Sequence, residues 1–233
     1  MSERGIALIM AVLFTSFLCA IGVGLALIVF MDRLAVGNMR GSVGLLYAAD
    51  AGIELAARDL SRANDWSSVL GGLERGSLTD GVPGGVRQTP GTSINLTTLT
   101  NQLNCGSDAD CTSTQMDTST RDRPWAGNNP RWQLYGYAPF STLAELERPT
   151  ACYLVIWIAD DAREQDDDPS SDAVDEEPGH GVLRVRAEAF GSGGARRGIE
   201  AELVRFCLAG SVPGSCQAGI RVQSWLEVRQ AVP

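Results

Sequence analysis

The 233-residue sequence is poor in basic residues and in histidine. It has 19 Lys and Arg against 28 Asp and Glu, a single histidine, and a formal net charge of -9. Nucleic-acid binding needs basic side chains clustered on one face of a fold. The composition therefore argues against a nucleic-acid partner, and the acidic balance suits a soluble surface outside the cytoplasm.

The motifs of the common enzyme classes are also missing. The sequence has no Cys-x-x-Cys pair, no Gly-x-Ser-x-Gly elbow and no glycine-rich phosphate loop, and His180 is its one histidine. Zinc ligation and Ser-His-Asp chemistry are therefore disfavoured. Many of the carboxylates lie in one loop, at residues 160–180, whereas glycosidases need two carboxyl groups that face each other across a cleft. We expect a protein that is not an enzyme and has no organic cofactor.

Cysteine usage indicates an oxidising compartment with two disulfides. Cys19 lies within an apolar run, and the others follow far downstream, at Cys105, Cys111, Cys152, Cys207 and Cys216. Pairing of neighbours gives Cys105–Cys111 and Cys207–Cys216 and leaves Cys152 free. A bond between Cys152 and Cys207 across neighbouring strands is the alternative, and the sequence does not decide between them.

Residues 6–31 form an uncharged apolar run. As a helix this run would be about 39 Å long, and about 20 apolar residues suffice to span a bilayer. A removable secretion signal has a shorter apolar core, of about 7–15 residues. We therefore predict a transmembrane helix. Arg4 and the α-amino group favour an N-terminus in the cytoplasm and the bulk of the chain outside.

The periodicity of the apolar run continues past the predicted membrane segment. Residues spaced by three and four predict one stripe along an amphipathic helix over residues 32–60. The stripe consists of Val36, Met39, Val43, Leu46, Asp50, Ile53, Ala57 and Leu60. The sequence thus predicts a single helix that is half in lipid and half amphipathic.

The remainder of the chain divides at about residue 150. Turn residues dominate 61–150, which we interpret as an irregular connecting region with a short helix at Ser141–Glu147. Its aromatic residues are interpreted as packing. Residues 151–233 indicate a sheet, with strands predicted at Cys152–Ala159, Val182–Phe190, Ile199–Phe206 and Ile220–Val228. The first is a nearly continuous apolar run, which suits a strand covered on both faces. The others alternate, with one apolar face formed in the second by Leu183, Val185, Ala187 and Ala189, and in the last by Ile220, Val222, Leu226 and Val228, opposite Trp225. The predicted fold class is α+β, a long N-terminal helix packed on an antiparallel sheet of about four strands.

An acidic loop is predicted over residues 160–180, between the first two strands. Oxygen ligands at this density suit Ca²⁺, and the candidate ligands are Asp160, Asp161, Asp166, Asp168 and Asp172. The run lacks the spacing of an EF-hand loop. The alternative is a solvated loop held open by repulsion between its own charges.

The N-terminal 60 residues resemble a known family. A short leader ending in Gly5, followed at once by a long apolar helix with an amphipathic continuation, is similar to the class III signal of type IV pilins and pseudopilins. Within that superfamily, the segments Arg-Gly-Ile-Ala-Leu at 4–8, Leu-Ala-Val-Gly-Asn at 34–38 and Ala-Ala-Asp-Ala-Gly at 48–52 resemble minor pilins of the PilX type.

The resemblance implies how the N-terminus is processed. Prepilin peptidase would remove the leader 1–5 by cutting between Gly5 and Ile6, and Ile6 would become an N-methylated terminus. Major pilins usually have Glu at the fifth mature position, where this chain has Met10. A buried ammonium is costly unless it is paired, and a subunit with Met10 cannot offer its neighbour that partner. This favours a minor or initiating role over a major structural one.

The expected function is therefore that of a non-enzymatic minor pilin at or near the tip of a type IV pilus. The expected partners are the inner membrane, prepilin peptidase, other minor pilins, the major pilin and a tip adhesin. The K-type pseudopilin of type II secretion has a similar start and is the alternative within the class. A membrane-anchored periplasmic binding protein, which could depend on calcium, is the alternative from another class.

Overall fold

The computed structural model describes residues 3–119, 130–143, 151–164, 166–172, 179–207 and 218–228. Its helices are α1 (Glu3–Leu60), α2 (Trp66–Leu70), α3 (Leu96–Cys105) and α4 (Ser113–Ser119), with 3₁₀ turns η1 (Phe140–Thr142) and η2 (Ser192–Gly194). Its strands are β1 (Val86–Thr89), β2 (Thr92–Asn95), β3 (Gln133–Pro139), β4 (Tyr153–Asp160), β5 (Val182–Phe190), β6 (Arg196–Cys207) and β7 (Ala218–Val228). The chain divides into two compact units, Met1–Gly41 and Ser42–Pro233.

The first unit is the N-terminal part of α1. From Ile6 onward its large apolar side chains are exposed, and Met39 keeps 69% of its surface accessible. The segment has no proline and no charge between residues 6 and 31, so nothing in it interrupts the helical hydrogen bonds. The predicted continuity of one helix from the apolar run to residue 60 is confirmed.

The second unit is built on an antiparallel sheet with the strand order β3-β4-β5-β6-β7. The α+β prediction is confirmed, with five strands in this sheet rather than about four. The additional strand is β3, which lies in the region that we interpreted as irregular. Sequence patterning located the other four, and β5 has the predicted bounds, Val182–Phe190.

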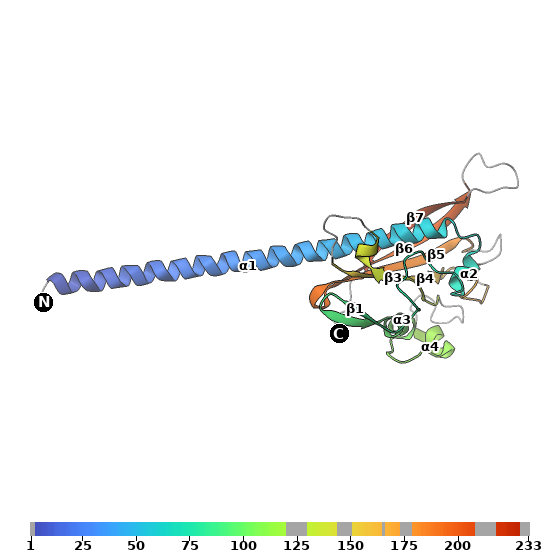
Figure 1. The fold of residues 1–233 in the computed structure, drawn as a ribbon, viewed down its shortest axis with the longest axis horizontal. Helices are drawn as coiled ribbons and strands as arrows, with labels where there is room; N and C mark the ends of the chain where they lie inside the picture. Colours follow the sequence, from blue (N-terminus) through green and yellow to red (C-terminus); the bar gives the residue numbers. More distant parts are fainter. Residues whose placement is uncertain are drawn as a thin grey trace. The chain divides into compact units, whose positions relative to one another are not determined.

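The C-terminal part of α1 packs on one face of this sheet (Figure 1). Its buried side chains there are mostly small, and include Ala48, Ala49 and Ala56 beside Ile53. A Cβ on Gly52 would lie 3.0 Å from the Cβ of Ala187, which is tighter than most real Cβ contacts. The helix therefore approaches the sheet more closely than large side chains would permit.

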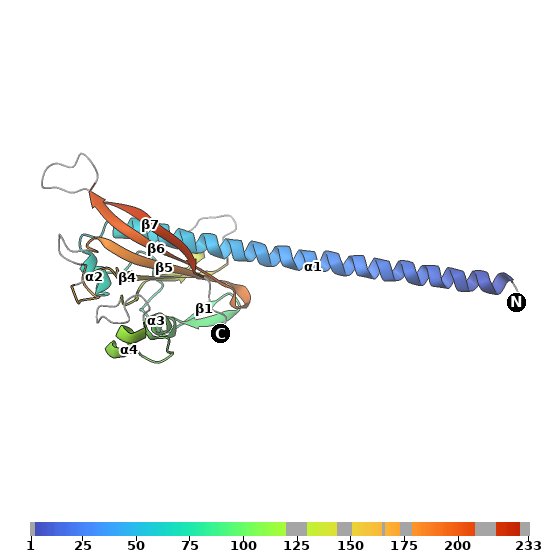
Figure 2. The ribbon, with the colours of Figure 1, turned by 180° about the vertical axis from the view of Figure 1, so that it is seen from behind.

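Helix α3 lies on the opposite side of the sheet from α1 (Figure 2). Aromatic side chains cover the sheet on this side. Leu96 of α3 packs with Tyr153 and Trp157 of β4, and with Trp132 and Tyr137. Every residue of β4 is buried, which confirms the prediction of a strand covered on both faces. Trp132 and Tyr137 fill the interior, as we expected for the aromatic residues of 61–150; Trp125 lies outside the described residues.

The predicted stripe on α1 is only partly correct. Ile53 and Leu60 are buried, whereas Val36, Met39 and Val43 are exposed. The buried row is instead formed by Leu45, Ala48, Ala49, Gly52, Ile53, Ala56 and Leu60. The prediction was partly wrong because it was based on the spacing of large apolar residues, whereas the residues of α1 that pack on the sheet are mostly small.

The predicted faces of the last strand are also partly wrong. The register of β6 and β7 shifts between Glu202 and Leu203, which leaves one extra residue on β7. Beyond this bulge, each side chain of β7 lies on the face opposite to the one that simple alternation predicts. Trp225 therefore lies on the side of α1 and donates its indole N–H to Asp50 (3.1 Å), while Leu226 faces the other side.

The region 61–150 contains more regular structure than the sequence predicts. Helix α3 is capped at its N-terminus by Asn95, whose side chain accepts hydrogen bonds from the backbone of Thr97 and Thr98. It is capped at its C-terminus by Gly106 in the left-handed region. The predicted helix Ser141–Glu147 corresponds in part to η1; its residues 144–147 lie outside the described part of the chain.

Candidate functional site

The exposed apolar surface of α1 is the most unusual feature of the molecule. The helix is long and apolar enough to cross a membrane by its length and composition, and the most apolar window within it is 0% buried. Isolated exposed apolar residues are normal on a soluble protein, whereas a continuous surface of this kind marks a site of contact with lipid or protein. Residues 6–31 suit lipid, as the sequence predicts.

The apolar surface does not end with the predicted membrane segment. Asp32 and Arg33 mark a polar boundary, but Val36, Met39 and Val43 are exposed beyond it. Tyr47 follows with 70% of its surface accessible. These four residues are spaced by three and four along α1, which is the spacing of one helical face. A second exposed apolar surface thus follows the lipid-length one.

The predicted processing site lies at the start of the same helix. Helix α1 begins at Glu3, so Gly5 and Ile6 are within its first turns. Ile6 and Met10 are both exposed. Nothing in the structure tests cleavage or methylation, and both stay predictions.

The acidic loop begins with carboxyl groups that are buried rather than solvated. Asp160, Asp161 and Glu164 are all buried, although Asp161 pairs with the guanidinium of Arg163 (3.0 Å). Burial, followed by a hydrogen bond with Glu164, raises the pKa of Asp160 to about 10. This raised pKa favours the protonated form of the Asp160 carboxyl at neutral pH. Neither of our interpretations of this loop anticipated buried carboxyl groups.

The other candidate calcium ligands serve local turns. Asp166 accepts a hydrogen bond from the backbone of Asp168 (2.8 Å), and Asp168 accepts two from Ser170, which lower its pKa. Asp172 accepts one from the backbone of Gly181, and burial raises its pKa. Within the described residues, no three Asp, Glu, His or Cys side chains are grouped as a metal site would require. The calcium interpretation stays a prediction that this geometry does not support.

The cysteines follow the local pairing as far as the structure describes them. Cys105 and Cys111 form a disulfide that closes the loop after α3. Cys152 is free and buried, and burial raises its pKa to about 11. The alternative bond between Cys152 and Cys207 is wrong, because Cys152 adjoins the end of the sheet where β6 begins and Cys207 ends β6 at the other. Cys216 lies outside the described residues.

One edge of the sheet is closed by an extended segment that sequence reasoning missed. Residues 76–81, here called the strap, run along the free side of β3. The backbone amides of Gly76 and Asp80 donate to Tyr135 and Tyr137, and Tyr137 donates to Leu78 (2.7 Å). A Cβ on Gly76 would lie 2.9 Å from the ring of Tyr135, so only glycine fits there. The strap thus satisfies backbone groups that would otherwise be unpaired.

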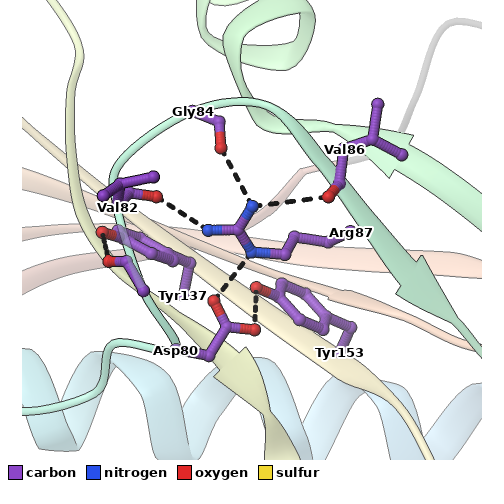
Figure 3. Close-up of polar contacts among 8 residues, drawn as sticks. Asp80, Val82, Gly84, Val86, Arg87, Tyr137 and Tyr153 are labelled. Carbon is purple, nitrogen blue, oxygen red and sulfur yellow. Dashed lines mark hydrogen bonds and ion pairs between the residues drawn. The ribbon is translucent and has the colours of Figure 1, made fainter.

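The strap is held in place by Arg87 (Figure 3). The Arg87 guanidinium donates to Asp80 (2.8 Å) and to the carbonyls of Val82 (2.7 Å) and Gly84 (3.0 Å). The hydroxyl of Tyr153 donates to the second oxygen of Asp80 (2.8 Å). The hydrogen bond to Asp80 is the main cause that raises the pKa of Arg87, so this guanidinium stays charged. We call Arg87, Asp80 and Tyr153 the clamp.

Arginine and glutamate side chains form ion pairs on the α3 side of the sheet. Glu188 is buried and pairs with Arg186 (2.6 Å) and with Arg196, and Arg184 pairs with Glu200. Buried carboxylates need such partners. The polar groups of the clamp and of these ion pairs bond to one another or to nearby backbone, and they stabilise the fold. They leave the exposed surface of α1 as the candidate functional site.

Comparison with known proteins does not extend this description: no family model, no curated protein and no solved structure matches the chain.

Proposed function

We propose that this chain is a minor subunit of a type IV pilus, similar to the PilX type, which inserts in the inner membrane and then enters a filament at or near its tip. The observation that carries the proposal is the exposed apolar surface of α1 between Leu34 and Tyr47, beyond the length that lipid needs.

Lipid alone does not account for this surface. A helix from Ile6 to Tyr47 is about 63 Å long at 1.5 Å per residue, whereas the hydrocarbon core of a bilayer is about 30 Å thick. Apolar side chains outside that core are stabilised by contact with protein. A filament whose subunits contribute similar helices supplies that contact, and a permanently anchored binding protein does not.

The proposed route follows from the two parts of the surface. The helix first spans the membrane, with its N-terminus in the cytoplasm and the sheet outside. Prepilin peptidase removes residues 1–5. The subunit then leaves the membrane as partner helices cover its apolar surface. Met10 provides no carboxylate for a neighbouring ammonium, which favours a position where that pair is not required. The partners are the major pilin, other minor pilins and a tip adhesin.

Mass spectrometry of the N-terminus tests the processing step. The chain has no lysine, so a reagent specific for primary amines reacts only at an unmethylated N-terminus and does not react with an N-methylated Ile6. We expect the protein isolated from its own membranes to begin at a methylated Ile6, and Gly5→Val to retain Met1, while the matched variant Ser2→Ala is processed normally. A mature protein that keeps residues 1–5 would overturn the proposal.

A pair of substitutions on α1 tests the assembly step. Met39→Glu places a charge on the exposed apolar surface, and Asn38→Glu places the same charge one residue away, at an exposed polar position. We expect both variants to insert in the membrane, and only Met39→Glu to be lost from sheared fibres. Equal recovery of both variants in fibres would argue against the proposed surface. Recovery of the wild type only with a secretion complex would favour the K-type pseudopilin.

A further inference from the structure

Strand β7 forms the second edge of the sheet, and its backbone is unpaired on the outer side in the described part of the chain. The amide of Arg205 donates to Gly181 on the β5 side, so its partner Ile220 directs its own N–H and C=O away from β6. Alternation along the register gives the same outward direction to Val222 and, beyond the bulge, to Trp225 and Glu227. Water satisfies these donors and acceptors in the free chain, and an extended backbone can replace it with a row of hydrogen bonds.

Three large apolar side chains along this edge are accessible. Val222 and Trp225 are 39% and 49% exposed on the α1 side, and Leu226 is 66% exposed on the other. Edge strands commonly avoid pairing by carrying lysine or proline, and residues 218–228 contain neither. Strand β7 carries the charges of Arg221 and Glu227 and one bulge, and outward backbone groups continue on both sides of this bulge.

The charges of the edge indicate the chemistry of its occupant. Glu227 already has a cation nearby, with Arg197 3.9 Å away. Arg221 is exposed, and no described carboxylate pairs with it. The open charge on β7 is therefore positive, on a protein whose net charge is -9. A segment that carries a carboxylate opposite Arg221 would complement it.

The other edge of the same sheet shows what such a segment looks like. The strap is extended, pairs with β3 through backbone hydrogen bonds, and places Thr79 opposite Tyr137. The chain thus covers one edge with a segment of its own, through three backbone hydrogen bonds and an isolated bridge.

From these observations we propose that β7 binds an extended segment of another polypeptide by strand addition. The segment has apolar side chains on the α1 side and an aspartate or glutamate aligned with Arg221. The proposal does not depend on the pilin assignment, since it requires neither cleavage at Gly5 nor entry into a filament.

A synthetic peptide tests the proposal directly. The probe is the capped, fluorescein-labelled sequence Val-Thr-Val-Asp-Val-Thr-Val, titrated against the full chain in detergent micelles and followed by fluorescence anisotropy, with empty micelles as the blank. We expect saturable binding that weakens at least about tenfold in Val222→Pro, because proline removes an outward N–H and adds bulk at the edge. The matched Val222→Ala keeps that N–H and should bind within about threefold of the wild type.

Methylation of the peptide backbone gives a second test that leaves the protein unchanged, and it decides the question if Val222→Pro does not fold by circular dichroism. Strand addition uses the N–H groups of alternate residues only. One peptide is therefore methylated on the amides of its two inner valines, and its control on those of its two threonines. We expect one of the two to lose binding and the other to keep it. No saturable binding up to about 1 mM peptide, or equal binding of both methylated forms, would overturn the proposal.

Discussion

The two edges of the sheet solve the same physical problem in different ways. At β3 the strap pairs with the outer backbone, and Arg87 holds the strap through Asp80 and the carbonyls around it. At β7 no described residue pairs with the outer backbone. An unpaired edge is a liability in water. A chain that closes one edge with a dedicated clamp and leaves the other open has an edge available for a partner.

Near each edge an aromatic side chain also donates to an aspartate. Tyr153 donates to Asp80 at the closed edge, and Trp225 donates to Asp50 at the open one. Tyr153 is 2% exposed and Trp225 is 49% exposed. The same kind of hydrogen bond should therefore contribute more at the closed edge, where water does not compete. This difference can be measured.

Removal of the clamp arginine should have the largest effect. Arg87→Ala leaves the Asp80 carboxylate and the carbonyls of Val82 and Gly84 without their donor. We expect the free energy of unfolding to fall by about 2–3 kcal/mol, measured by urea denaturation of the full chain in detergent. The control Arg62→Ala removes an exposed arginine and should change it by less than about 0.5 kcal/mol. Equal effects of the two substitutions would show that the closed edge does not depend on the clamp.

Alkaline pH should loosen the closed edge next. Burial raises the pKa of both Tyr135 and Tyr153 above the ordinary value of about 10. Above that pH the unfolded chain releases both protons and the folded chain keeps them, so stability is complete below about pH 10 and falls as pH rises, by at most about 1.4 kcal/mol per pH unit for each tyrosine. Urea denaturation between about pH 9 and 11 checks this. If the double variant Tyr135→Phe, Tyr153→Phe shows the same fall of the free energy of unfolding with pH as the wild type, the two tyrosines are not its cause.

Loss of the tyrosine hydroxyl alone should have a smaller effect. Tyr153→Phe removes the donor to Asp80 and keeps the ring in its packing with Leu96 and Trp157. We expect a loss of about 1 kcal/mol in the free energy of unfolding at neutral pH. The matched control is Tyr47→Phe, since Tyr47 is largely exposed. If Tyr47→Phe costs as much as Tyr153→Phe, burial does not decide the strength of the bond.

Sequence patterning predicted the parts of this fold that repeat regularly. The alternation in Val182–Phe190 gave β5 with its observed bounds, and Leu183, Val185, Ala187 and Ala189 are buried as predicted. The apolar run at β4 gave a strand buried on both faces. In these segments local periodicity and tertiary packing agree, so a single sequence suffices.

The features that patterning missed depend on contacts between distant residues. The strap contains Gly76, whose place is set by the ring of Tyr135 far along the chain. The bulge on β7 arises from the pairing with β6, and one extra residue there reversed our assignment for Trp225. The buried row on α1 uses alanine and glycine, which a search for large apolar residues passes over. The clamp similarly joins three segments, and the spacing of Asp80, Arg87 and Tyr153 carries no local signal.

The open edge should show the smallest effect, and it completes the comparison. Trp225→Phe removes the indole N–H that donates to Asp50 and keeps an aromatic ring on the α1 side of β7. Because half of this side chain is accessible, water can replace the lost donor, and we expect a change of about 0.5 kcal/mol or less in the free energy of unfolding. Urea denaturation of Trp225→Phe and Tyr153→Phe under the same conditions gives the ratio of the two losses in the free energy of unfolding. A cost for Trp225→Phe equal to that of Tyr153→Phe would mean that the β7 edge is already covered, and strand addition there would then have to displace the covering segment first.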